Sequence, residues 1–370
     1  MKHILHSLVI FMAYNDLFIH SSIGATVSSE LKLIHRHGDR TPIQCYPTDP
    51  YSNDTYWADG WGELTPRGKQ RMYGLGKYLR KRYQDFLSSN PREVQIRSSA
   101  ADRCLESVAL VMAGLYRPEG RWQWNNDLGH QWQPFPIQTE PRDVDGMLNS
   151  GSKCLAAEQE LTRIHNSPEY LQYVDQSKDI LNYVSSNTGL NITDLNGAEE
   201  VFDTLLIEKE NGYPLPRWAS DATTYEKLSQ ISDMTFYFDF STQLVQRLRT
   251  GLLLKDIIKH MNETVNRKHD TQLALLLNAL NVFDRKSPPF GSTIMIELRQ
   301  SNGKPMIEMF YLNNTESEEP IALTLPNCMN ATIECHFQQF VQSVNHLIPG
   351  DWNQECHNND SLSLATNTGL

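Results

Sequence analysis

The sequence of 370 residues predicts an α/β fold with an inserted helical subdomain. Within the first 115 residues, two short apolar strands each end near arginine and are followed by an amphipathic helix, as in a βαβ unit. Residues 154–225 are typical of short helices separated by Asn, Ser and Gly. Residues 293–311 alternate as two strands around a turn and predict a hairpin.

The first predicted strand, residues 31–34, leads into a loop that carries Arg36, His37 and Arg40. Gly38 permits a tight turn in this loop and Pro42 ends it. Loops at strand ends are where open α/β sheets bind ligands. Guanidinium groups bind phosphate oxygens and a neutral imidazole can attack phosphorus, so the loop predicts a phosphate site. The alternative is a surface loop with incidental charges.

The next elements repeat this arrangement. Thr65 and Pro66 predict a helix start, and apolar residues follow at helical spacing, namely Met72, Leu75, Leu79, Tyr83 and Phe86. Residues 93–97 predict a strand that ends at Arg97, with Ser98 and Ser99 as caps of the following helix. Since helix N-termini favour anions, Arg97 is a second candidate phosphate ligand.

The rest of the chain predicts a cap inserted into one domain. We expect a single domain over residues 27–370 with a helical cap at about 140–250. The expected elements are a strand at 135–139, helices at 155–164, 170–184, 198–207, 243–261 and 271–283, and strands at 293–298 and 306–311. His269 and Asp270 directly precede the helix at 271–283.

Residues 1–26 predict a secretory signal peptide, because an apolar run follows a basic start and small residues follow the run. Polar residues interrupt the run, so a disordered leader is the alternative. An even number of cysteines supports export, as do Asn-x-Ser/Thr glycosylation sites at Asn53, Asn191, Asn262, Asn313, Asn330 and Asn359. No later apolar run is long enough to span a bilayer. We therefore expect a secreted, lysosomal or luminal protein without a stable membrane anchor.

The charge balance limits the classes of partner. With 33 basic and 44 acidic residues, the net charge is −11, which disfavours nucleic acid as a partner. An anion site at Arg36 and Arg40 would be a local positive pocket in a protein of negative net charge. That arrangement favours small phosphorylated substrates.

The stretch from Arg36 to Pro42, together with Arg97 and the pair His269 and Asp270 in that order, resembles the histidine acid phosphatases. The secreted and lysosomal animal members, including arthropod venom and salivary proteins, are the most similar. The resemblance implies an α/β fold like that of phosphoglycerate mutase. Its sheet would be mixed and mainly parallel, with helices on both faces and a helical cap.

The resemblance also implies roles for the site residues. His37 would be the nucleophile that forms a phosphohistidine, and Asp270 would protonate the leaving alcohol. The phosphoryl oxygens would be bound by Arg36, Arg40, Arg97 and His269. No metal or other cofactor is implied, and homodimers are common in the family. Because a carboxyl group must be protonated to act as an acid, we expect an acidic pH optimum.

The six cysteines divide into three pairs. The resemblance implies one disulfide between Cys154 and Cys356, and a close pair at Cys328 and Cys335 is consistent with a second. Cys45 and Cys104 are then left, and a third bridge between them is a hypothesis that requires the two segments to be neighbours.

Competing interpretations remain open at this point. The same scaffold could serve as a secreted protein that binds a small ligand with weak or no catalysis, since fold does not determine function. A phytase-like phosphatase is a second alternative. His35 and His37 could form a metal pair, but no carboxylate or cysteine lies at ligand spacing. The complete set of motif residues favours the enzyme.

Overall fold

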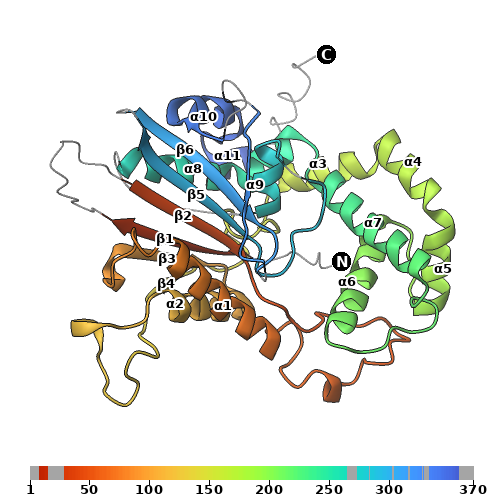
Figure 1. The fold of residues 1–370 in the computed structure, drawn as a ribbon. Helices are drawn as coiled ribbons and strands as arrows, with labels where there is room; N and C mark the ends of the chain where they lie inside the picture. The colour runs from red at the N-terminus through yellow and green to blue at the C-terminus, as the bar shows by residue number, and fades with distance from the viewer. Residues whose placement is uncertain are drawn as a thin grey trace.

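The computed structural model describes residues 8–15, 29–264, 273–282, 284–301, 304–315, 317–326, 328 and 333–357. Figure 1 shows a central sheet with helices on both faces and a group of helices that lies to one side of it. Among the described residues, no helix is both long enough and apolar enough to cross a membrane.

The sheet has the strand order β4-β3-β1-β2-β5-β6-β7, and β8 also pairs with β6. The strands are β1 (Leu8–Asn15), β2 (Ser29–Arg36), β3 (Val94–Ser98), β4 (Ile137–Gln138), β5 (Thr293–Ser301), β6 (Lys304–Leu312), β7 (Ile321–Ala322) and β8 (Cys335–His336). Among these strands only β3 and β4 pair in parallel. The expectation of a mainly parallel sheet is therefore wrong for the described strands.

Two additions to the βαβ unit explain the antiparallel pairing. β1 lies between β2 and β3 and is antiparallel to both, so β2 and β3 run in the same direction without touching as neighbours. The hairpin of β5 and β6, which was predicted, adds to the other side of β2 in antiparallel register. The carboxyl ends of β2 and β3 consequently point to the same edge of the sheet, as the βαβ pattern predicted.

β1 falls inside the segment that the sequence predicts to be a signal peptide. In the structure, Phe11 pairs with Leu33 of β2 and with Ile96 of β3. A cleaved signal peptide would leave the mature chain without this strand, so retention of β1 and cleavage after about residue 26 exclude each other. The signal peptide stays a prediction, which N-terminal sequencing of the exported protein tests.

Two helices cover one face of the sheet, α1 (Pro66–Arg82) and α2 (Asp102–Leu115). The predicted start of α1 is confirmed, because the Thr65 side chain accepts a hydrogen bond from the Gly68 amide and Pro66 is the first helical residue. α2 starts later than expected. Its N-cap residue is Ala101, whereas Ser98 still belongs to β3. Both helices pack on Leu31, Leu33 and Ile96 in one apolar cluster.

The opposite face is covered by α8 (Gln243–Thr264), α9 (Leu273–Ala279) and α10 (Phe337–Val344). Their apolar residues form a second cluster with Ile34, Ile294 and Ile296 of the sheet. The alternation of Leu33 and Ile34 between the two clusters follows from the period of two in a strand.

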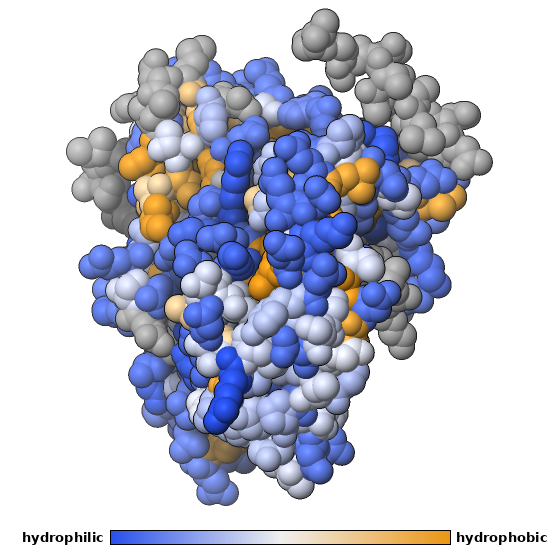
Figure 2. Space-filling model, turned by 90° about the vertical axis from the view of Figure 1, so that its right-hand side faces the viewer, coloured by the Kyte–Doolittle hydropathy of each residue, from blue (hydrophilic) through white to orange (hydrophobic). Residues whose placement is uncertain are grey.

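Five helices, α3 to α7, follow one another between the sheet strands β4 and β5. They are α3 (Leu155–His165), α4 (Pro168–Gln176), α5 (Lys178–Thr188), α6 (Leu195–Glu210) and α7 (Ala222–Asp239). The single helix expected at 170–184 is divided at Ser177, and α7 was not predicted. α4 to α7 share an apolar cluster of their own. The side of the molecule formed by these helices is mostly hydrophilic, with small apolar patches (Figure 2).

Short elements complete the described chain. They are the 3-10 helices η1 (Asp54–Tyr56), η2 (Pro91–Glu93), η3 (Gly120–Trp122) and η5 (Asn345–Leu347), and the helix α11 (Trp352–His357).

Two of the expected disulfides are present. Cys154 before α3 bonds to Cys356 in α11, and Cys328 bonds to Cys335. The hypothetical bridge between Cys45 and Cys104 is wrong, because neither residue forms a disulfide. Cys104 is fully buried in the cluster under α1 and α2, whereas Cys45 lies in the loop that faces α6 beside Asp49 and Glu208. The two segments pack on different partners, which explains the missing bridge.

Candidate functional site

The site is built around the arginine loop, residues 36–42, which follows β2. Backbone hydrogen bonds hold it on two sides: the Gly291 amide donates to the His37 carbonyl (3.1 Å), and the Thr41 amide donates to the Glu63 carbonyl (2.9 Å). A Cβ atom on Gly38 would lie 2.6 Å from the carbonyl oxygen of Gly68 in α1. Only glycine therefore lets the loop approach α1 this closely.

Asp39 connects the arginine loop to α1 through ion pairs. Its carboxylate accepts hydrogen bonds from Arg71 Nε (2.6 Å) and Arg71 Nη2 (3.1 Å), and Arg67 lies at 3.4 Å. The sequence assigned no role to Asp39. The structure shows that it pairs with cations of the helix and fixes the base of the loop.

His37 is fully buried in the loop. Its Nδ1 lies 2.8 Å from the Gly38 carbonyl oxygen. Because a carbonyl only accepts, Nδ1 carries the hydrogen and Nε2 carries the lone pair. Nε2 is buried and has no hydrogen-bond partner among the described residues.

The surroundings of His37 keep it neutral. Burial lowers the pKa of the imidazole well below its ordinary value, and the charges of Arg103, Arg36 and Arg40 lower it further. Both effects disfavour a second positive charge in the pocket. The Nε2 lone pair therefore stays available in mildly acidic solution, which a nucleophile requires.

Arg36 and Arg40 flank this histidine, and Phe290 touches all three. The Arg36 guanidinium lies 4.2 Å from the Phe290 ring centre and donates to the Pro288 carbonyl, while Arg40 lies 6.0 Å from the ring. The His37 and Phe290 rings are 5.5 Å apart. The Nε atoms of both arginines are buried without a partner among the described residues. Buried donors of this kind can bind an oxyanion.

Residues that sequence reasoning missed complete this pocket. Arg103, in the first turn of α2, is 8% exposed and is the charge that acts most strongly on His37. The sequence could have indicated Arg103 as a site residue, because it lies at the start of a helix six residues after Arg97. Asp203 of α6 accepts two hydrogen bonds from Arg40 Nη2, at 3.1 and 3.0 Å. No local pattern marked Asp203, because the contact spans 163 positions.

Arg97 pairs with carboxylates in the structure. Its Nη2 donates to Asp145 at 2.7 Å, and Glu140 lies at 3.8 Å. In the sheet, Ile10 of β1 pairs with Arg97 on one side and with Ile34 on the other. Arg97 is thus two strand spacings, about 10 Å, from β2. His269 and Asp270, the other expected site residues, lie outside the described residues.

His35 lies at the end of β2, one residue before the arginine loop. It is fully buried, its Nδ1 lies 3.2 Å from the Arg36 carbonyl oxygen, and burial lowers its pKa to about 4. In the described part of the chain, no group of three or more His, Cys, Asp or Glu side chains is arranged to hold a metal ion.

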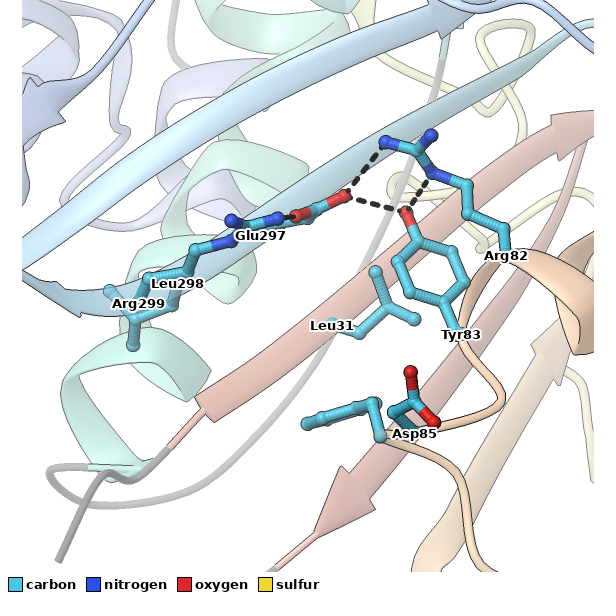
Figure 3. A pocket seen from close by; sticks show the side chains of 8 residues that line it. Leu31, Arg82, Tyr83, Asp85, Glu297, Leu298 and Arg299 are labelled. Carbon is cyan, nitrogen blue, oxygen red and sulfur yellow. Dashed lines mark hydrogen bonds and ion pairs between the residues drawn. The ribbon is translucent and has the colours of Figure 1, made fainter.

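A separate pocket of about 390 Å³ lies toward the start of β2, near Leu31 and about 16 Å along the strand from Arg36 (Figure 3). Glu297 accepts hydrogen bonds there from Tyr83 Oη (2.9 Å) and Arg82 Nη2 (3.2 Å), and it also pairs with Arg299. Because these contacts join Glu297 to its polar neighbours Tyr83, Arg82 and Arg299, we assign the pocket a structural role.

The chain is similar to known proteins over most of its length. Residues 29–312 match the model of the histidine phosphatase superfamily (branch 2). Rat lysosomal acid phosphatase is 35% identical over 367 residues, covering 95% of this chain and 85% of the relative. Human prostatic acid phosphatase is 34% identical over 356 residues, covering 91% and 90%.

Solved structures show the same fold at much lower identity. The phytase of Klebsiella sp. ASR1 has a TM-score of 0.59 and 14% identity, and the match covers 85% of this chain and 93% of that one. The phytase of Citrobacter braakii has a TM-score of 0.57 and 15% identity, covering 85% and 96%. These two similarities concern the fold alone. From the family match and the identity to acid phosphatases over most of its length, the chain belongs to the histidine phosphatase superfamily, branch 2.

Proposed function

We propose that the protein is an acid phosphatase that hydrolyses phosphate monoesters through a phosphohistidine on His37. One observation carries the proposal: the Nε atoms of Arg36 and Arg40 and the Nε2 atom of His37 are buried on one loop without a partner among the described residues. A buried donor left unpaired costs about 1–3 kcal/mol, so a bound group that supplies oxygens is favoured. A phosphoryl group offers oxygens to both guanidiniums and a phosphorus atom to the imidazole.

The reaction has two steps. In the first, the Nε2 lone pair forms a bond to phosphorus while the bond from phosphorus to the ester oxygen breaks, and the leaving alkoxide takes a proton. In the second, water attacks phosphorus and gives a proton to the carboxylate that donated one in the first step, the bond from phosphorus to Nε2 breaks, and phosphate leaves. Arg36 and Arg40 stabilise the negative charge on the phosphoryl oxygens in both steps.

The remaining roles come from the motif. We propose Asp270 as the proton donor to the leaving group, and Arg97 and His269 as further phosphoryl ligands. Arg97 is bound to Asp145 in the structure, so phosphate would compete with that carboxylate for the guanidinium. Because the donor must be protonated, we propose that the enzyme works best in acid.

We further propose that the protein is exported to the outside of the cell or to a lysosomal or other luminal compartment. The lysosomal acid phosphatases among its relatives support this location. Asn53 and Asn191, two of the predicted glycosylation sites, are exposed, as a glycan requires. We propose small phosphorylated molecules as substrates and a homodimer as the assembly, which the mass of the native protein in solution would test.

The experiment is turnover of a panel of phosphate monoesters by the wild type and by His37→Ala, together with trapping of labelled phosphate on the protein in an acid quench. We expect at least a 1,000-fold loss in kcat for His37→Ala and no trapped label, on the scale of lost covalent catalysis. His130→Ala, which removes another imidazole, bonded to the Pro118 carbonyl, is the matched control and should keep its activity. A wild type that binds phosphate esters without hydrolysing them would instead identify a ligand-binding protein.

A further inference from the structure

Helix α6 places a carboxylate directly on the arginine loop. The Arg40 side chain is 1% exposed, and Asp203, at 7%, binds it through both carboxylate oxygens. This ion pair joins the helical group to the loop after β2. It also balances the charge of one of the two guanidiniums that face the proposed phosphoryl group.

The same helix acts on the second arginine. The charge of Asp203 and that of Glu210 both favour the charged form of Arg36, whose pKa burial lowers to about 10. Glu199 lies one turn before Asp203, and burial together with the Asp203 charge raises its pKa to about 8. Glu199 is therefore neutral in acid, and Asp203 is the α6 charge in contact with the loop.

The neighbouring cations of α1 are engaged as well. Arg71 makes a two-point ion pair with Asp39, and Arg67 lies 3.4 Å from the same carboxylate. Asp203 and Asp39 thus pair with three cations around the loop, Arg40, Arg67 and Arg71. Donor capacity remains at the Nε atoms of Arg36 and Arg40, which is enough for the oxygens of one phosphoryl group.

We propose that Asp203 is a specificity-determining residue that makes the pocket selective for esters with a single phosphate group. The inference rests on the proposed phosphatase function. A substrate with further phosphates brings negative charge toward the Asp203 carboxylate, while Arg40, Arg67 and Arg71 already have carboxylate partners. At an effective dielectric constant of about 20, one unit charge about 10 Å from a second phosphate changes its binding roughly tenfold.

The test compares kcat/KM for phenyl phosphate and for inositol hexakisphosphate at pH 5. We expect the wild type to prefer phenyl phosphate by at least about 100-fold, and Asp203→Asn to lower that ratio by roughly tenfold. The amide of Asn keeps one oxygen for Arg40 Nη2, so the variant removes the charge and preserves a contact. A purely structural loss would reduce both rates and leave the ratio unchanged.

Glu200→Gln is the matched control. It removes the same charge from the same helix, but the Glu200 carboxylate is bound by Gln44 Nε2 at 2.9 Å. The ratio of the two kcat/KM values should stay within about twofold of the wild type, because Glu200 is half-buried and salt screens its charge more than that of the buried Asp203.

The outcomes separate the two proposals. A wild type without turnover of either ester refutes the phosphatase function. A wild type that hydrolyses phenyl phosphate but shows a ratio near one refutes the inference alone, even if Asp203→Asn does not fold. If folded Asp203→Asn keeps the wild-type ratio of the two kcat/KM values, the inference is also refuted. It is refuted as well if Glu200→Gln changes this ratio as much as Asp203→Asn does.

Discussion

A buried pair of carboxyl groups makes the stability of this protein depend on pH. Glu208 of α6 is fully buried, and Asp49, in the loop that follows the arginine loop, is 5% exposed. The Asp49 carboxyl group is close enough to raise the pKa of Glu208. Ionised carboxylates only accept hydrogen bonds, so the two groups can bond to each other only when one of them holds a proton. Without that proton, both Glu208 oxygens would be buried with no partner among the described residues.

The sign of the pH effect follows from the protonation of the two states. Burial, and then the charge of Asp49, raises the pKa of Glu208 in the folded protein from 4.5 to about 9. Between these values the folded state holds a proton that the unfolded state has released. The free energy of unfolding therefore falls as pH rises, by about 1.4 kcal/mol per pH unit, and does not depend on this group below about pH 4.5. From pH 5 to pH 7 the loss is about 3 kcal/mol.

Glu208→Gln removes this dependence. The amide keeps the volume of the side chain and donates an N–H to Asp49 at any pH. We expect the variant to match the wild type at pH 5 and to exceed its unfolding free energy by up to about 3 kcal/mol at pH 7. Urea unfolding followed by tryptophan fluorescence at pH 5, 6 and 7 measures the difference.

Glu200→Gln is again the matched control, because it is the same change on the same helix at a half-buried position. Glu199 titrates in both the wild type and Glu208→Gln, so its effect cancels in their difference. A difference between wild type and Glu208→Gln that is the same at pH 5 and pH 7 would refute the reasoning. A protein most stable in acid would suit the proposed lysosomal or luminal location.

Three further predictions follow from the site and its frame. Gly38→Ala places a Cβ 2.6 Å from the Gly68 carbonyl oxygen, so we expect the arginine loop to shift. The shift should lower kcat/KM at least 100-fold and the free energy of unfolding by about 1–3 kcal/mol. Kinetics equal to those of the wild type would contradict this prediction. Replacing Cys154 and Cys356 together by Ala opens a link across 202 positions and should lower the unfolding free energy by about 2–5 kcal/mol, measured in urea without reductant. The pH–rate profile on phenyl phosphate should peak below pH 7, because the proposed donor Asp270 must be protonated, and an alkaline optimum would exclude that role.

Much of the fold could be predicted from local sequence patterns. The strand before Arg36, the cap at Thr65 and Pro66, and the hairpin of β5 and β6 all depend on neighbours within a few residues, and the structure confirms them. The start of α2 was misplaced because both Ser98 and Ala101 precede a helix-forming run; Ser98 belongs to β3, and the Ala101 carbonyl accepts a hydrogen bond from the Leu105 amide at the start of the helix. The central position of β1 could not be foreseen, since an apolar run at the N-terminus predicts a leader and not a strand.

The sequence by itself determined the chemistry of this protein: an arginine loop with one histidine after a strand, in a chain whose motifs and length match histidine acid phosphatases. These features lie within short stretches, where residue type and spacing carry the information. Only the tertiary structure decided the electrostatics of the loop. Asp203 on Arg40, Arg103 beside His37 and Glu208 on Asp49 are contacts between segments far apart in the chain. Such pairs arise from how helices pack on loops and strands, which no local period encodes.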